Sequence, residues 1–121
     1  MNHKTKSIRS FIGAKDFNES RAFYKGLGFQ ENAISKDMSY FQVEPNIGFY
    51  LQKAYVKDWV DNTMIFLEVD NVERYRDELT LLDLHNKYER VKLSGIHNND
   101  WGREIFMHDP SGILWHFGEF Y

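Results

Sequence analysis

Apolar residues in the first half of the chain occur in short runs separated by turn residues, a pattern typical of short strands and helices. A short helix is predicted through Arg21–Lys25, with Asn18 as its N-cap and Gly26 and Gly28 at its end. Residues 53–61 are predicted to form a connector. The strands expected in this half are residues 7–14, 29–34, 39–43 and 48–52.

The same order of elements starts again in the second half of the chain. Apolar residues from Val72 to Leu82 recur at intervals of three and four, which predicts an amphipathic helix. The interval from Asp16 to Asp70 equals that from Glu19 to Glu73, which indicates a weak internal repeat. The strands expected here are Thr63–Val69, Glu89–Leu93, Arg103–Met107 and Ile113–Phe117.

The last two of these strands are joined by the tetrapeptide Asp109-Pro110-Ser111-Gly112, which predicts a tight turn. Proline presets its own backbone angle, aspartate bonds the local backbone, and glycine accepts a positive φ. By itself this segment predicts a hairpin.

Composition excludes several classes of function. The 18 acidic and 15 basic residues give a net charge of −3, so no nucleic-acid surface is expected. The chain has no cysteine and therefore no disulfide, thiolate metal site or cysteine nucleophile. No apolar run approaches the ~20 residues of a membrane span. No apolar run follows Met1–Lys6 either, so no signal peptide is expected and the prediction is a cytoplasmic protein.

Together with Phe23-Tyr24-Lys25-Gly26-Leu27-Gly28-Phe29, the hairpin resembles the vicinal-oxygen-chelate superfamily of glyoxalases, bleomycin-resistance proteins and extradiol dioxygenases. The resemblance implies an α+β fold in which two βαβββ modules form a curved eight-stranded mixed sheet around a cleft. Residues 1–121 would be a single domain with modules at about 7–53 and 62–120, joined by a connector at 54–61. It also implies a homodimer, which would cover the open edges of such a sheet.

The resemblance also places four positions where the metalloenzymes of this superfamily keep their ligands. They fall on Arg9, Thr63, His116 and either Phe49 or Tyr50. A lone imidazole holds a divalent ion weakly, and a guanidinium has no lone pair to donate. No metal and no other cofactor is therefore expected at this site, and the chain is predicted not to be a metal-dependent enzyme.

Strand alternation then predicts an apolar cleft with three polar anchors, Arg9, Thr63 and His116. In bleomycin-resistance proteins a Trp-Gly pair precedes a similar hairpin, as Trp101-Gly102 does here, and aromatic residues stack on the ligand. The other residues predicted to line the cleft are Phe11, Phe41, Tyr50, Trp59, Trp101 and Leu114. An aromatic or anionic small molecule is the expected ligand, and Arg9 with His116 disfavours cationic bleomycin itself.

Three functions remain open at this point. The first is a metal-independent small-molecule binding protein of the resistance type. The second is a lyase, isomerase or dioxygenase of the same superfamily with an atypical site, in which His116 or Glu104 acts as a base. The third is a scaffold with a vestigial cleft. A structural role also remains open for Arg9, as the partner of Glu68 or Glu104, and for His116.

Overall fold

Eight strands and four helices alternate along the chain, and the computed structural model describes residues 1–121. The first half contains β1 (Phe11–Gly13), α1 (Phe17–Gly26), β2 (Gln30–Ser35), β3 (Met38–Glu44), β4 (Ile47–Gln52) and α2 (Lys57–Asp61). The second half contains β5 (Met64–Glu68), α3 (Val72–Leu82), α4 (Leu84–Lys87), β6 (His97–Asn98), β7 (Gly102–His108) and β8 (Leu114–Phe120).

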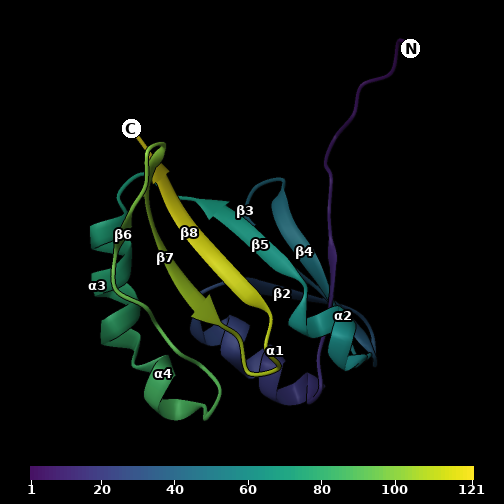
Figure 1. Ribbon diagram of the computed structural model, residues 1–121. Coiled ribbons are helices and arrows are strands. Elements are labelled where there is room, and N and C mark those ends of the chain that lie inside the picture. Colours follow the sequence, from purple (N-terminus) through teal and green to yellow (C-terminus); the bar gives the residue numbers. More distant parts are fainter.

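Each half forms a four-stranded sheet of the same topology, with orders β1-β4-β3-β2 and β5-β8-β7-β6. In both sheets the first strand pairs in parallel with the last strand, and the last strand pairs antiparallel with the strand before it. The predicted α+β class with two βαβββ modules is therefore confirmed, and hydrogen bonding divides the strands into two mixed sheets of four. Residues 1–10 are exposed, and the N-terminal end of this segment extends away from both sheets (Figure 1).

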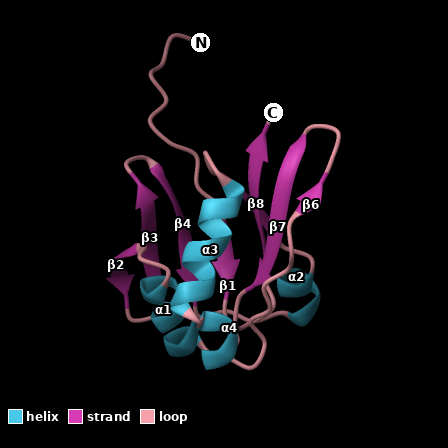
Figure 2. Ribbon diagram, turned by 90° about the vertical axis from the view of Figure 1, so that its left-hand side faces the viewer, coloured by secondary structure: helices cyan, strands magenta, loops and turns pink.

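One hydrophobic core is shared by the two modules, and Tyr24 on α1 lies within it. The Tyr24 ring is 5.0 Å from Phe49 on β4 and 5.8 Å from Trp115 on β8. Helix α3, in the foreground of Figure 2, packs against β7 and β8, and its residues Val72 and Leu79 are buried. None of the helices is both long enough and apolar enough to cross a membrane.

Side-chain caps set the start of both long helices. The Asp16 carboxylate accepts the Glu19 amide at 3.1 Å and caps α1, so the predicted cap at Asn18 is wrong by two residues. Asn71 caps α3 in the same way, at 2.9 Å from the Arg74 amide. Gly28 follows α1 with φ 93°, a conformation that glycine adopts without strain.

Two predicted strands need correction. The strand expected at residues 7–14 covers only Phe11–Gly13, because the residues before it lie in the exposed N-terminal segment. The strand expected at Glu89–Leu93 does not form. Its segment makes one isolated bridge, from Leu93 to Met107, and the edge strand is the two-residue β6 instead. Helix α4 was not expected.

The predicted turn at residues 109–112 is confirmed. The Asp109 Oδ1 atom accepts the amides of Ser111, Gly112 and Ile113, each at 2.9 Å. Gly112 has φ 111°, the conformation for which a glycine was expected. A hydrogen bond links this turn to α1: the hydroxyl of Tyr24, a residue of α1, donates to the Asp109 Oδ2 atom at 2.6 Å.

A charged cluster joins α1 to β2 and gives a first testable prediction. The Arg21 guanidinium donates to both Glu31 oxygens, at 2.6 and 3.0 Å, and the Ser39 hydroxyl donates to the same carboxylate at 2.7 Å. The Glu31 side chain is only 10% exposed. The hydrogen bond from Arg21 is the main cause that lowers the pKa of Glu31 from 4.5 to about 2.

We expect Glu31→Gln to lower the free energy of unfolding by about 1–2 kcal/mol at pH 7, since it removes the charge that Arg21 binds. A lowered pKa in the folded state stabilises the protein above pH 4.5, and this contribution is lost as the pH falls toward about 2. The difference between the wild type and the variant should therefore shrink over that window in urea titrations. Glu44→Gln, at an exposed residue, is the control. A pH-independent difference would contradict the prediction.

Candidate ligand-binding face

The second sheet has one face packed into the core and one open face. Along β8, Trp115 and Phe117 are buried, while the alternate residues Leu114 and His116 lie on the open face. His116 is paired in register with Phe66 on β5 and with Phe106 on β7. These three side chains therefore form a row across the sheet.

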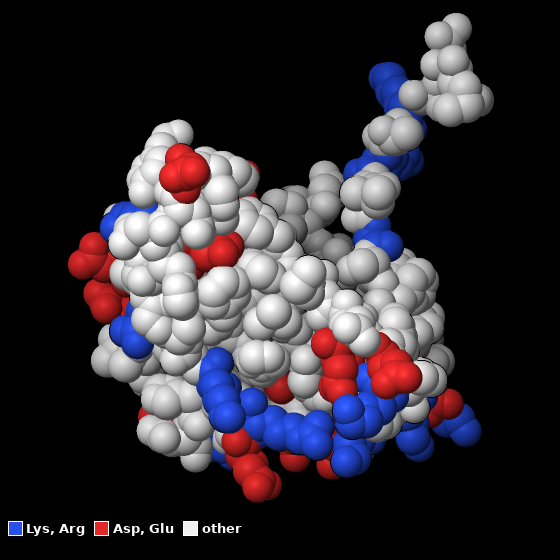
Figure 3. Space-filling model, viewed as in Figure 1, with Lys and Arg blue, Asp and Glu red and all other residues white.

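Further aromatic rings extend this row. Phe106 lies 4.9 Å from His116 and 5.0 Å from His97, measured between ring centroids. Phe66 lies 5.7 Å from Trp101 and 5.8 Å from Phe120. Together the "aromatic face" consists of Phe66, His97, Trp101, Phe106, His116 and Phe120. Figure 3 shows that uncharged atoms cover most of the surface over β5, β7 and β8.

A carboxylate and an imidazole meet within the aromatic face. His116 Nδ1 lies 3.5 Å from Glu104 Oε2, and His116 Nε2 lies 3.4 Å from the Met64 sulfur. The side chains of His116 and Glu104 are 20% and 13% exposed. A carboxylate in this place orients the imidazole ring and favours the tautomer with a proton on Nδ1. The Nε2 atom then carries a lone pair, and the Met64 sulfur lies against it.

The residues of this face do not fit a divalent metal ion. His116 and Glu104 bring two donors together, and no group of three or more His, Asp or Glu side chains is placed to hold a metal. The chemistry that these side chains offer is therefore hydrogen bonding, proton transfer and ring stacking.

The predicted anchor Arg9 lies on the other sheet. Its guanidinium donates to the Tyr50 hydroxyl at 2.9 Å and lies 4.1 Å from the centre of the Tyr40 ring. Phe11 stacks on Tyr50, with ring centroids 4.7 Å apart. Arg9, Phe11 and Tyr50 are thus brought together as predicted, but with Tyr40 and not with His116. Neither Glu68 nor Glu104 forms an ion pair with Arg9, because the two tyrosines hold the guanidinium.

Three residues predicted to line the cleft lie elsewhere. Phe41 is fully buried and stacks on Phe49, so it cannot contact a ligand. Trp59 packs on the core beside Gly13. The Thr63 hydroxyl donates to the Trp59 carbonyl at 2.6 Å, and Thr63 precedes β5. The single cleft with Arg9, Thr63 and His116 as anchors is therefore not present within the chain.

Thr63 as an anchor would place the alternate residues Ile65 and Leu67 on the open face of β5, and this prediction is wrong. Met64 and Phe66 are 64% and 44% exposed, whereas Ile65 and Leu67 pack against the core. Phe106 and Phe120 were also missed. The strand sequence Met-Ile-Phe-Leu-Glu is apolar on both faces, so the sequence does not indicate which side chains face the core. Of the predicted residues, Trp101, Leu114 and His116 do lie on or beside the aromatic face.

Comparison with solved structures identifies the fold. A bleomycin-binding protein from bleomycin-producing Streptomyces verticillus, complexed with copper(II)-bleomycin, superposes with a TM-score of 0.81 over 98% of this chain and 99% of its own, at 20% identity. TnmS3, an antibiotic-binding protein from Streptomyces sp. CB03234, matches with a TM-score of 0.76 over 100% and 99%, at 16% identity. A lactoylglutathione lyase from Agrobacterium tumefaciens matches with a TM-score of 0.73 over 97% and 96%, at 15% identity.

No protein-family model and no curated protein sequence matches the chain. Both antibiotic-binding proteins and an enzyme are among the structural matches, so the match fixes the architecture and leaves the chemistry to the residues of the site. The paired βαβββ modules and the near-complete coverage in both directions point to one conclusion. The chain has the fold of the glyoxalase and bleomycin-resistance superfamily.

Proposed function

We propose that the chain is a metal-independent small-molecule binding protein that stacks a planar group of its ligand on the aromatic face. The observation that carries this proposal is the exposure of three large rings in one cluster: Phe66 is 44% exposed, Trp101 37% and Phe120 52%. Contiguous apolar surface of this kind marks an interaction site. The bleomycin-binding protein and TnmS3 are structural neighbours that bind antibiotics, which supports the same class of function here.

The charge on the aromatic face bears on the class of ligand. Glu104 lies there, whereas Arg103, its neighbour on β7, points to the other face and binds Glu119 at 3.0 Å. Arg9 belongs to the first sheet and does not add a positive charge to the aromatic face. Arg9 and His116 together suggested an anionic ligand. With Glu104 and without Arg9, the aromatic face is instead expected to prefer a neutral or cationic planar ligand.

We expect Trp101→Ala to weaken binding of a planar ligand about fivefold or more, because ring stacking of this kind is worth about 1–3 kcal/mol. Suitable probes are copper(II)-bleomycin, the planar cation proflavine and the planar anion anthraquinone-2-sulfonate, titrated by calorimetry. Trp59→Phe is the matched control and should change affinity less than about twofold. Unchanged affinity in Trp101→Ala, or tighter binding of the anion than of the cation, would contradict the proposal.

A homodimer forms part of this proposal. The aromatic face is an open surface in one chain, and apolar side chains on both sheets are exposed, among them Phe11, Ile47 and Met64. A second copy would cover such surface and turn an open face into a cleft. Sedimentation equilibrium at several protein concentrations measures this directly, and a monomer at all of them would refute the dimer.

Enzymatic proton transfer is the second candidate, and the contact between His116 and Glu104 favours it. Mass spectrometry and NMR of a bound ligand recovered from the protein distinguish the two functions. A ligand that is recovered unchanged supports a binding protein. Conversion that the wild type performs and His116→Gln lacks, with binding retained, would instead establish an enzyme.

A further inference from the structure

An open cavity of about 720 Å³ lies at the end of the fold where β7 turns into β8, away from the aromatic face. None of the residues that line it belongs to the aromatic face. Eight of its nine lining residues are polar, charged or glycine. Its lining residues are Lys15, Tyr55, Lys57, Asp61, Glu89, Arg90, Lys92, His108 and Gly112.

Positive charge is in excess around this cavity, although the whole chain has a net charge of −3. Four cationic side chains face two carboxylates. Lys57 is paired with Asp61 at 2.7 Å, while Lys15, Arg90 and Lys92 form no ion pair. Figure 3 shows lysine and arginine atoms in a continuous band across this part of the surface. Three unpaired cations around one concavity attract a multivalent anion.

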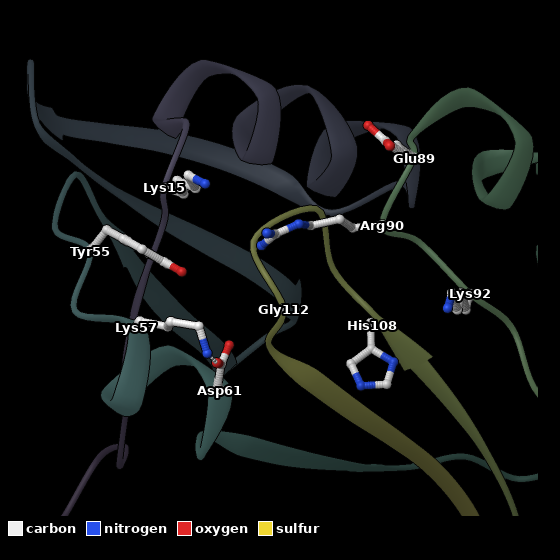
Figure 4. Close-up of a pocket in the computed structure, with 9 residues that line it drawn as sticks. All are labelled: Lys15, Tyr55, Lys57, Asp61, Glu89, Arg90, Lys92, His108 and Gly112. Carbon is white, nitrogen blue, oxygen red and sulfur yellow. Dashed lines mark hydrogen bonds and ion pairs between the residues drawn. The ribbon is translucent and has the colours of Figure 1, made fainter.

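The donors converge on a common space in Figure 4. The Arg90 guanidinium, the Tyr55 hydroxyl and the Lys57 amine point into the opening from different elements, and Lys15 lies at its rim. Arginine and lysine are the residues that most often bind phosphate, arginine through its planar fork of donors. The cavity is within the size range of small-molecule sites, and the flanking carboxylates Asp61 and Glu89 limit the area open to a larger polyanion.

The rim of the cavity is fixed by a buried serine. The Lys15 amide donates to Ser111 Oγ at 2.9 Å, and Arg90 Nη1 donates to the Ser111 carbonyl at 3.4 Å. Ser111 is 1% exposed and also lies 3.3 Å from Ser20, measured between the two hydroxyl oxygens. The Lys15 backbone and the Arg90 guanidinium, distant in sequence, are thus held to the same turn. Such an arrangement needs little reorganisation when an anion binds.

We propose that this cavity binds a phosphate-bearing small molecule with at least two negative charges, at a site separate from the aromatic face. Arg90 and Lys15 contact the phosphate oxygens, Lys92 adds long-range attraction, and the Tyr55 hydroxyl donates a hydrogen bond. The proposal of a phosphate site does not depend on whether a planar ligand binds to the second sheet.

Calorimetric titration with inorganic pyrophosphate tests the site, with citrate as a polycarboxylate of similar charge. Lys15→Gln/Arg90→Gln should weaken pyrophosphate binding about 100-fold, since each of the two lost charge-assisted contacts is worth about tenfold. Lys4→Gln/Lys6→Gln removes the same charge from the exposed N-terminal segment and should change affinity less than about twofold. Thermal unfolding of both variants checks that the fold is intact.

Amide chemical shifts give a second measurement that needs no variant. Pyrophosphate should move the amide resonances of Gly112 and His108 in the wild type and leave that of Trp101 in place. The absence of binding below the millimolar range, an equal loss of affinity in both double variants, or citrate binding as tight as pyrophosphate would each overturn the proposal.

Discussion

Asp109→Ala is expected to lower the free energy of unfolding by about 3–4 kcal/mol, because it leaves several buried donors without an acceptor. The Asp109 carboxylate accepts three backbone amides and the Tyr24 hydroxyl, and the residue is fully buried. Burial raises the pKa of Asp109, and the hydrogen bonds from Tyr24 and the turn amides oppose that rise. Burial, followed by the charge of Asp109, raises the pKa of Tyr24 well above its ordinary value, so its hydroxyl remains a donor.

Two smaller changes at the same place separate the turn from the contact with α1. Asp109→Asn retains an oxygen for the turn amides but places an amide NH2 group, a donor, opposite the Tyr24 hydroxyl, and should cost about 2 kcal/mol. Tyr24→Phe also removes the acceptor of Trp115 Nε1, which lies 2.9 Å from the hydroxyl, and should cost about as much. Denaturant unfolding of the two variants and their combination measures the coupling. Fully additive losses would show that the side chains act independently, against this expectation.

Gly13→Ala is expected to cost about 2–3 kcal/mol through a steric clash. A Cβ atom at Gly13 would lie 2.3 Å from the Ala54 carbonyl oxygen and 2.5 Å from the Trp59 ring. The carbonyl belongs to the backbone and already accepts the Ala14 amide at 3.1 Å, so it cannot move aside without breaking that bond. Denaturant unfolding should also show whether α2, which carries Trp59, detaches before the rest of the chain.

Gly95→Ala provides the matched control for this substitution. A Cβ atom at Gly95 meets nothing within 4 Å, and its φ is not positive. The variant should therefore unfold within about 0.5 kcal/mol of the wild type. An equal loss at Gly13 and Gly95 would contradict the clash as the cause, because alanine in place of an unstrained glycine restricts the unfolded chain and by itself stabilises the protein.

The turn and the helices show which parts of the fold the sequence specifies locally. Asp109 and Gly112 form the expected turn because their backbone preferences and hydrogen bonds lie within the tetrapeptide itself. The helix from Val72 to Leu82 was predicted from its apolar period and has those bounds. The strand predicted at residues 89–93 does not form, because strand pairing depends on a distant partner and this segment makes only one bridge, from Leu93 to Met107.

The candidate site was harder to predict because it depends on the phase of each strand and on how the modules pack. His116 was placed on the open face correctly, because the superfamily that the hairpin resembles keeps a site residue four positions after the turn glycine, here Gly112. In β5 every position but the last is apolar, so the outward position of Phe66 had no local signal. The separation of Arg9 from His116 follows from the arrangement of two sheets, which no single strand encodes.

The contact of Tyr24 with Trp115 and Asp109 has a consequence for how this chain can evolve. A fragment cut within the connector would leave Tyr24 without the acceptor and the indole that it contacts across the module boundary. We expect neither half to fold alone, so the two modules share one cooperative transition. The outer surfaces of the two sheets take no part in these core contacts. A mutation on the surface of one sheet can therefore change that surface without changing the other. A fold built from two such modules has two surfaces that can change independently. Because the modules unfold together, a protease meets either the whole folded chain or the whole unfolded chain.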